Sequence, residues 1–78
     1  MSKRETVRAF VADLLGRKGD RGHVTDDEAL LDRGRLDSTD VLELVAFAEE
    51  KFGVDFAARG FDQGDFNSVD TIVAMLGE

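Results

Sequence analysis

Three stretches of this 78-residue chain repeat apolar residues at intervals of three and four, the spacing that places side chains on one face of an α-helix. The first two cover residues 3–15 and 38–52, and the third begins after residue 67. The segment 56–66 is too interrupted by glycine for more than a short helix, and no stretch shows convincing strand alternation. We therefore predict an all-α fold, a small bundle of three main helices plus one short helix, with a long loop between the first two main helices.

The same spacing predicts which side chains form the core. The expected core residues of the three main helices are, in order, Val7, Phe10, Val11, Leu14 and Leu15; Val41, Leu44, Val45, Ala48 and Phe52; and Val69, Ile72, Val73 and Leu76. Phe47 falls outside this face, and we expect the segment from Phe56 to Phe66 to cover it. Phe61 and Phe66 in that segment also need burial.

Capping residues support these boundaries. Ser2 with Glu5 fits a capping box at the first helix, and Asn67 or Ser68 can cap the last one. In the long loop, Thr25 with Glu28 predicts a further capped turn, which the following leucines pin to the core: Leu30, Leu31 and Leu36.

Other features of the long loop have simple interpretations. Its start, residues 16–22, is rich in glycine but lacks the spacing of a phosphate-binding loop, and is read as a mobile surface segment. Asp26, Asp27 and Glu28 lack the alternating spacing of calcium ligands and are interpreted as solvated acids, so no metal site is predicted. His23 is expected to be a surface residue.

Composition limits the possible functions. A chain of this length forms one domain, residues 1–78, too small for a deep active site. Without cysteine it has no disulfide, thiolate zinc site or thiol nucleophile, so any thiol chemistry must be brought in. It shows neither a membrane-spanning run nor an apolar signal region, so we expect a cytoplasmic protein without membrane insertion.

Charge is distributed unevenly along the chain. Residues 1–36 hold eight Lys/Arg against seven Asp/Glu, whereas residues 37–78 hold two against ten. Such an acidic second half repels nucleic acids and favours partner proteins with basic patches. Repulsion among its acids predicts that moderate salt raises the melting temperature. Pairing of these acids, for example with Arg33 or Arg35, would remove that effect.

Ser38 stands between two aspartates, Asp37 and Asp40, at the predicted start of the second main helix. A hydroxyl there lies near backbone N–H groups without intrahelical partners and near the positive end of the helix dipole, so an esterified phosphate is well tolerated. A nucleophilic serine needs an adjacent base that removes the proton of its hydroxyl. The chain has one histidine, His23, and carboxylates of ordinary pKa are poor bases for a hydroxyl. We therefore interpret Ser38 as a substrate for modification and the chain as a non-enzyme.

One turn beyond Ser38, the helix carries a second face. Thr39, Leu42 and Ala46 project away from the expected core, and this small apolar strip is bordered by acids: Glu43, Glu49 and Glu50. Modest apolar burial combined with charge is what a transient docking site needs. The strip is predicted to contact partner proteins.

At this point the chain resembles the acyl carrier proteins and their relatives, the peptidyl and aminoacyl carrier proteins. The resemblance rests on residues 30–38 before the serine (LLDRGRLDS), on Glu43-Leu44-Val45 and residues 49–53 (EEKFG) in the second helix, and on residues 65–69 (DFNSV) before the last helix. Each match is weak alone, and together they are strong. The resemblance implies an acyl-carrier-protein-like fold.

The resemblance also implies a function. Ser38 would receive 4'-phosphopantetheine from coenzyme A through a phosphopantetheinyl transferase, with Asp37 as the neighbouring acid of the modification motif. The terminal thiol of the arm would carry an acyl intermediate as a thioester between partner enzymes of a fatty acid, polyketide or other specialised pathway. The expected docking positions are Thr39, Asp40, Leu42, Glu43, Ala46, Glu49 and Glu50.

Further partners implied by the resemblance are a loading ligase or transferase and downstream synthases, transferases or thioesterases with basic patches. We expect a monomer. Thr39 and the order Phe47-Ala48 depart from the family pattern, which favours a specialised pathway over housekeeping fatty acid synthesis. Two alternatives stay open, an aminoacyl, D-alanyl or peptidyl carrier and an unmodified helical interaction module.

Overall fold

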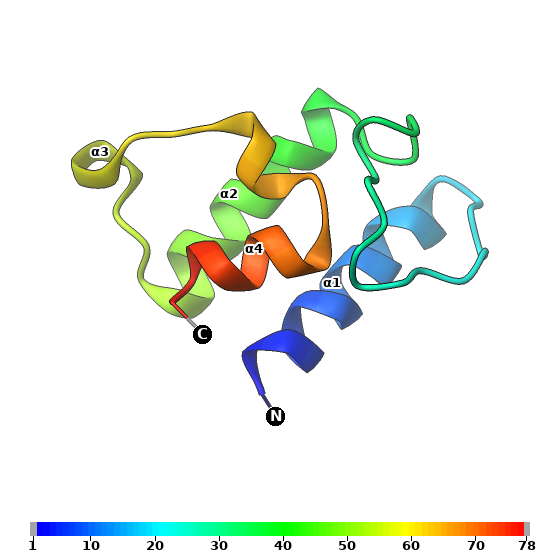
Figure 1. Cartoon of the computed structure of the whole chain (residues 1–78), viewed down its shortest axis with the longest axis horizontal. Coiled ribbons are helices and arrows are strands. Elements are labelled where there is room, and N and C mark those ends of the chain that lie inside the picture. Colours follow the sequence, from blue (N-terminus) through cyan, green and yellow to red (C-terminus); the bar gives the residue numbers. More distant parts are fainter. Residues whose placement is uncertain (1, 78) are drawn as a thin grey trace.

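The computed structural model describes residues 2–77, which form five helical segments and, within that range, no β-strand (Figure 1). The segments are α1 (Lys3–Arg17), α2 (Ser38–Phe52), α3 (Phe56–Arg59), the 3-10 helix η1 (Gln63–Phe66) and α4 (Val69–Met75). The prediction of an all-α bundle with three main helices and one short helix is confirmed, and η1 adds a single turn. No helix in the described range is long and apolar enough to cross a membrane.

Side chains cap the main helices much as predicted. The hydroxyl of Ser2 accepts the backbone N–H of Glu5 at 3.1 Å, and α1 then continues through Gly16 to Arg17, two residues beyond its predicted end. α2 ends at Phe52, and the next residue, Gly53, has a φ of +66°, in the left-handed region that glycine adopts at low cost. Ser68, rather than Asn67, caps α4 and forms a reciprocal capping box with Thr71.

One core joins the three main helices. Its buried residues are Val7, Val11, Leu14, Leu15, Leu30, Leu36, Val41, Leu44, Phe47, Phe66, Val69, Ile72 and Val73. Figure 1 shows α4 lying in front of α2, with α1 beside them and the long loop passing over α1. Most of the predicted core is therefore correct, including the loop leucines 30 and 36.

Two phenylalanines differ from their predictions. Phe47 is covered by α1 rather than by the segment after α2, because its ring stacks on that of Phe10 with centroids 4.1 Å apart. The buried arc of α2 is thus rotated toward Phe47 and away from Val45, which is only half-buried. Phe61 is 53% exposed, although it was expected to be buried, and it contacts Phe66 with one side of its ring.

The long loop is fixed to the rest of the protein by polar contacts. Asn67 anchors it, since its backbone oxygen accepts the N–H of Leu30 at 2.7 Å and its side-chain oxygen accepts the N–H of Leu31 at 2.9 Å. Further along, the guanidinium of Arg35 binds the carboxylates of Asp20 and Glu28, each at 2.9 Å. Arg35 therefore holds the two halves of the loop together immediately before α2 begins.

These contacts bear on two expectations about the loop. The turn predicted at Thr25 is present, with the backbone N–H of Glu28 donating to the backbone oxygen of Thr25 at 3.3 Å, and the Glu28 carboxylate binds Arg35. The glycine-rich segment is also tied down, because the backbone oxygen of Gly22 accepts a hydrogen bond from Arg35 at 3.1 Å and the carboxylate of Asp20 binds the same guanidinium. The loop thus delivers the chain to the start of α2 in a defined geometry.

Candidate functional site

Ser38 is the first residue of α2, and its side chain is exposed. A helix of 15 residues has a positive N-terminal end, where backbone N–H groups lack intrahelical acceptors. Within residues 2–77, the backbone N–H groups of Ser38 and Thr39 have no hydrogen-bond acceptor. An anionic group attached to the Ser38 hydroxyl would therefore lie beside unpaired donors and a favourable dipole.

The two aspartates that flank Ser38 form a capping box. The carboxylate of Asp37 accepts the backbone N–H of Asp40 at 3.1 Å, and the carboxylate of Asp40 accepts the backbone N–H of Asp37 at 3.0 Å. This reciprocal pair satisfies two donors at the start of the helix and fixes the backbone on both sides of Ser38. The hydrogen bond from Asp40, together with the nearby charge of Lys18, holds the pKa of Asp37 below its usual range.

Lys18 reaches this capping box from the C-terminal end of α1. Its ammonium group forms an ion pair with the carboxylate of Asp40, lies 3.6 Å from that of Asp37 and donates to the backbone oxygen of Arg35 at 3.0 Å. The hydrogen bond to Asp40 raises the pKa of Lys18 above its usual value, so the lysine stays charged at neutral pH. Sequence reasoning missed this residue because it lies twenty positions before the serine.

The other serines of the chain already have structural roles. The hydroxyl of Ser2 caps α1 and donates to the Glu5 carboxylate at 3.2 Å, and Ser68 is buried in the capping box of α4. Within the described range, the hydroxyl of Ser38 makes no hydrogen bond. Of the three serines, Ser38 is therefore the one whose hydroxyl is exposed and not engaged in a cap.

The predicted docking residues lie along one side of α2 except for one. Thr39, Leu42, Glu43, Ala46, Glu49 and Glu50 are all exposed, and Leu42 is 67% exposed. Asp40, in contrast, is only 6% exposed, because its carboxylate serves the capping box and pairs with Lys18. Direct contact of Asp40 with a partner does not fit this position, so we remove it from the docking set.

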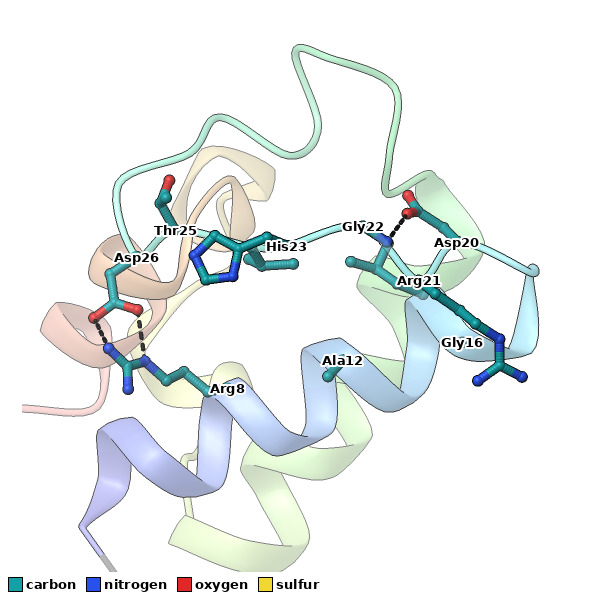
Figure 2. A pocket seen from close by; sticks show the side chains of 11 residues that line it. Arg8, Ala12, Gly16, Asp20, Arg21, Gly22, His23, Thr25 and Asp26 are labelled. Carbon is teal, nitrogen blue, oxygen red and sulfur yellow. Dashed lines mark hydrogen bonds and ion pairs between the residues drawn. The ribbon is translucent and has the colours of Figure 1, made fainter.

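A groove of about 820 Å³ lies elsewhere, between α1 and the long loop (Figure 2). Figure 2 shows Asp26 paired there with Arg8, and Asp20 accepting the backbone N–H of Gly22. The interpretation of residues 26–28 as solvated acids is wrong for Asp26 and Glu28, since both are held by arginines. Within the described residues, no cluster of potential metal ligands occurs.

The start of α2 fits a phosphate ester better than this groove does. It combines an exposed hydroxyl, backbone donors without acceptors and the positive end of a 15-residue helix, whereas no serine lines the groove. Asp37, at the same place, is exposed and oriented by its hydrogen bond. The residues present are therefore compatible with a prosthetic group linked through phosphate to Ser38.

Comparison with known proteins agrees with this geometry. The family model described as "Phosphopantetheine attachment site" matches residues 5–76, nearly the whole chain. No solved structure matches the chain. The family model covers α1 from its third residue onward and the whole of α2, α3, η1 and α4. The chain therefore belongs to the family of carrier domains that hold covalently bound 4'-phosphopantetheine.

Proposed function

We propose that Ser38 is the residue that carries 4'-phosphopantetheine, and that the chain transports an acyl group on the thiol of this arm. The observation that carries the proposal is the position of Ser38: an exposed hydroxyl at the N-terminus of α2, next to a fixed capping box, in a chain of the phosphopantetheine family. The arm supplies the thiol that a chain without cysteine lacks.

The chemistry of loading is a phosphoryl transfer. The Ser38 oxygen forms a bond to the phosphorus that carries pantetheine in coenzyme A, and the bond from that phosphorus to the bridging pyrophosphate oxygen breaks. Adenosine 3',5'-bisphosphate leaves, and the hydroxyl proton passes to a base of the transferase. The chain contributes the hydroxyl, the helix N-terminus that favours the phosphate, and Asp37 as an oriented acid beside it.

Carrier domains of this family work with a phosphopantetheinyl transferase and with acyl-handling enzymes, and they are not catalytic themselves. In this chain, the exposed strip of Leu42 and Ala46 with the neighbouring acids Glu43, Glu49 and Glu50 supports docking on basic patches of those enzymes. A tethered arm keeps the cargo at high effective concentration near each partner site. The protein itself thus acts by presentation, without catalysis.

The acidity of residues 37–78 favours an acyl carrier, and Thr39 favours a specialised pathway such as polyketide or modified lipid synthesis. An aminoacyl or peptidyl carrier is the second candidate, because it would share the arm and the bundle. The acid that an adenylating ligase loads onto the modified protein distinguishes the two. We further propose that the protein is a single-domain monomer and acts in the cytoplasm.

The test is modification of the pure protein by a broad-specificity transferase and coenzyme A, followed by intact-mass measurement. We expect one 4'-phosphopantetheine adduct on the wild type and none on Ser38→Ala. Ser2→Ala is the matched control and should be modified like the wild type, because Ser2 only caps α1. A wild type that stays unmodified would support the unmodified interaction module, and an adduct that persists in Ser38→Ala would overturn the site.

A further inference from the structure

Lys18 pairs with both carboxylates of the capping box, although it lies at the other end of the long loop, next to α1. It follows the last residue of α1, and its ammonium group contacts three groups at or just before the start of α2: the carboxylates of Asp37 and Asp40 and the backbone oxygen of Arg35. These three groups surround the backbone that leads into Ser38. Lys18 thus connects the end of one main helix to the start of the next.

The need for this cation follows from the burial of Asp40. Its carboxylate is almost completely shielded from water, and a buried charge without a partner is strongly unfavourable. Lys18 compensates the charge directly, and the same carboxylate accepts the backbone N–H of Asp37 at 3.0 Å. In turn, that hydrogen bond sets the backbone geometry of the residue immediately before Ser38.

We propose that Lys18 is a positioning residue for the modification of Ser38, acting through the carboxylates of Asp40 and Asp37 and without contacting coenzyme A. The proposal rests on Ser38 being the attachment residue. Phosphoryl transfer requires the attacking oxygen to be held in line with the leaving group, and small displacements of a reacting atom slow such steps strongly. Loss of Lys18 should therefore lower the turnover of the transferase reaction more than it weakens binding of the carrier.

The charge of Lys18 explains why its loss should affect kcat and KM differently. Lys18 partly neutralises the acids that a basic transferase would attract, so its removal makes the start of α2 more negative and should leave KM unchanged or lower it. At the same time, a loosened capping box misplaces the hydroxyl and lowers kcat. A residue that mattered only for docking would raise KM, and one that mattered only for folding would change neither constant below the melting transition.

The experiment measures kcat and KM of a broad-specificity transferase by intact mass, for the wild type, Lys18→Gln, Lys18→Arg and the control Arg21→Gln. We expect kcat to fall about tenfold in Lys18→Gln, to return to within about twofold of the wild type in Lys18→Arg, which keeps the charge, and to be unchanged in Arg21→Gln. Arg21 is an exposed loop residue, so its substitution removes the same charge without touching the capping box. All variants are assayed well below their melting temperatures.

A double-mutant cycle with Asp40→Asn tests whether Lys18 acts through Asp40. The amide keeps an oxygen that can accept the Asp37 N–H but no longer needs a cation, so Lys18→Gln should cost little more in the Asp40→Asn background. The inference would be overturned if the effects of Lys18→Gln and Asp40→Asn on kcat simply multiplied in the double variant. It would also be overturned if Lys18→Gln had the same kcat as Arg21→Gln. A wild type that is not modified at all would instead overturn the proposed function.

Discussion

The ring of Phe10 in α1 stacks on the ring of Phe47 in α2, with the planes only 13° apart and the centroids 4.1 Å apart. Phe52 completes the group by meeting Phe47 edge-on at 5.7 Å. This aromatic contact joins the two longest helices in the described range, next to the apolar core that they share with α4. It explains why α2 turns Phe47 inward although the spacing of its other apolar residues favoured a different face.

Truncation of Phe47 should therefore be far more costly than truncation of the exposed Phe61. We expect Phe47→Ala to lower the free energy of unfolding by about 3 kcal/mol, because it leaves a cavity and removes the stack on Phe10. Phe61→Ala should cost less than about 1 kcal/mol, since that ring is half exposed. Urea denaturation followed by circular dichroism measures both values. Similar losses in the two variants would contradict this assignment of the core.

The ion pairs of Lys18 change the expected response to salt. Asp37 and Asp40 are already opposed by Lys18, and Glu43 lies 3.8 Å from Arg17, so the acids of the second half are less repulsive than the sequence indicated. We expect moderate salt to raise the melting temperature only slightly in the wild type and clearly more in Lys18→Gln. Arg21→Gln serves as the charge-matched control and should behave like the wild type. Equal salt dependence in all three proteins would speak against the pairing.

The acids beside the exposed apolar strip of α2 predict that reversing one of their charges weakens recognition by a basic partner. Glu50→Lys should raise the KM of a basic transferase severalfold at low ionic strength and leave kcat unchanged, because long-range attraction acts on encounter. The difference should shrink as salt is added. Asp27→Lys, an exposed acid in the long loop, provides the control with the same change in charge. If both variants raise KM equally, the effect comes from net charge and not from the α2 face.

Arg35 should govern stability in acid. Its guanidinium holds the pKa of Asp20 and of Glu28 below their usual values. Because these carboxylates release their protons more readily in the folded protein, the stabilisation is complete above about pH 4 to 5 and is lost as pH falls through the lowered values. We expect the melting temperature to drop in that acidic range.

Removal of the arginine tests this linkage. Arg35→Met should lower the melting temperature at neutral pH and make its dependence on acid shallower, because Asp20 and Glu28 then titrate closer to their ordinary pKa values. Arg21→Met is the control without contacts to these carboxylates. Thermal melts from pH 7 down to pH 3 provide the measurement. An unchanged acid profile in Arg35→Met would show that other groups dominate.

Much of the candidate site was predictable because its parts are local. A serine flanked by acids at the start of an apolar-periodic segment specifies a capped helix whose first turn accepts a phosphate, and Asp37 and Ser38 occupy those positions. The exposure of Leu42 follows from the helical repeat in the same way. The burial of Asp40 was missed because the residue carries a charge, and only a partner from another element makes such burial tolerable.

The sequence by itself determined the three main helices, their caps and the position of Ser38, since each depends on residues within one or two turns of one another. The tertiary structure decided which side of α2 faces α1, which acids are paired, and that Lys18 and Arg35 hold the approach to Ser38. Those features depend on how helices cross and where a long loop is anchored. They arise from contacts between residues far apart in the chain, and no local pattern in a single sequence encodes them.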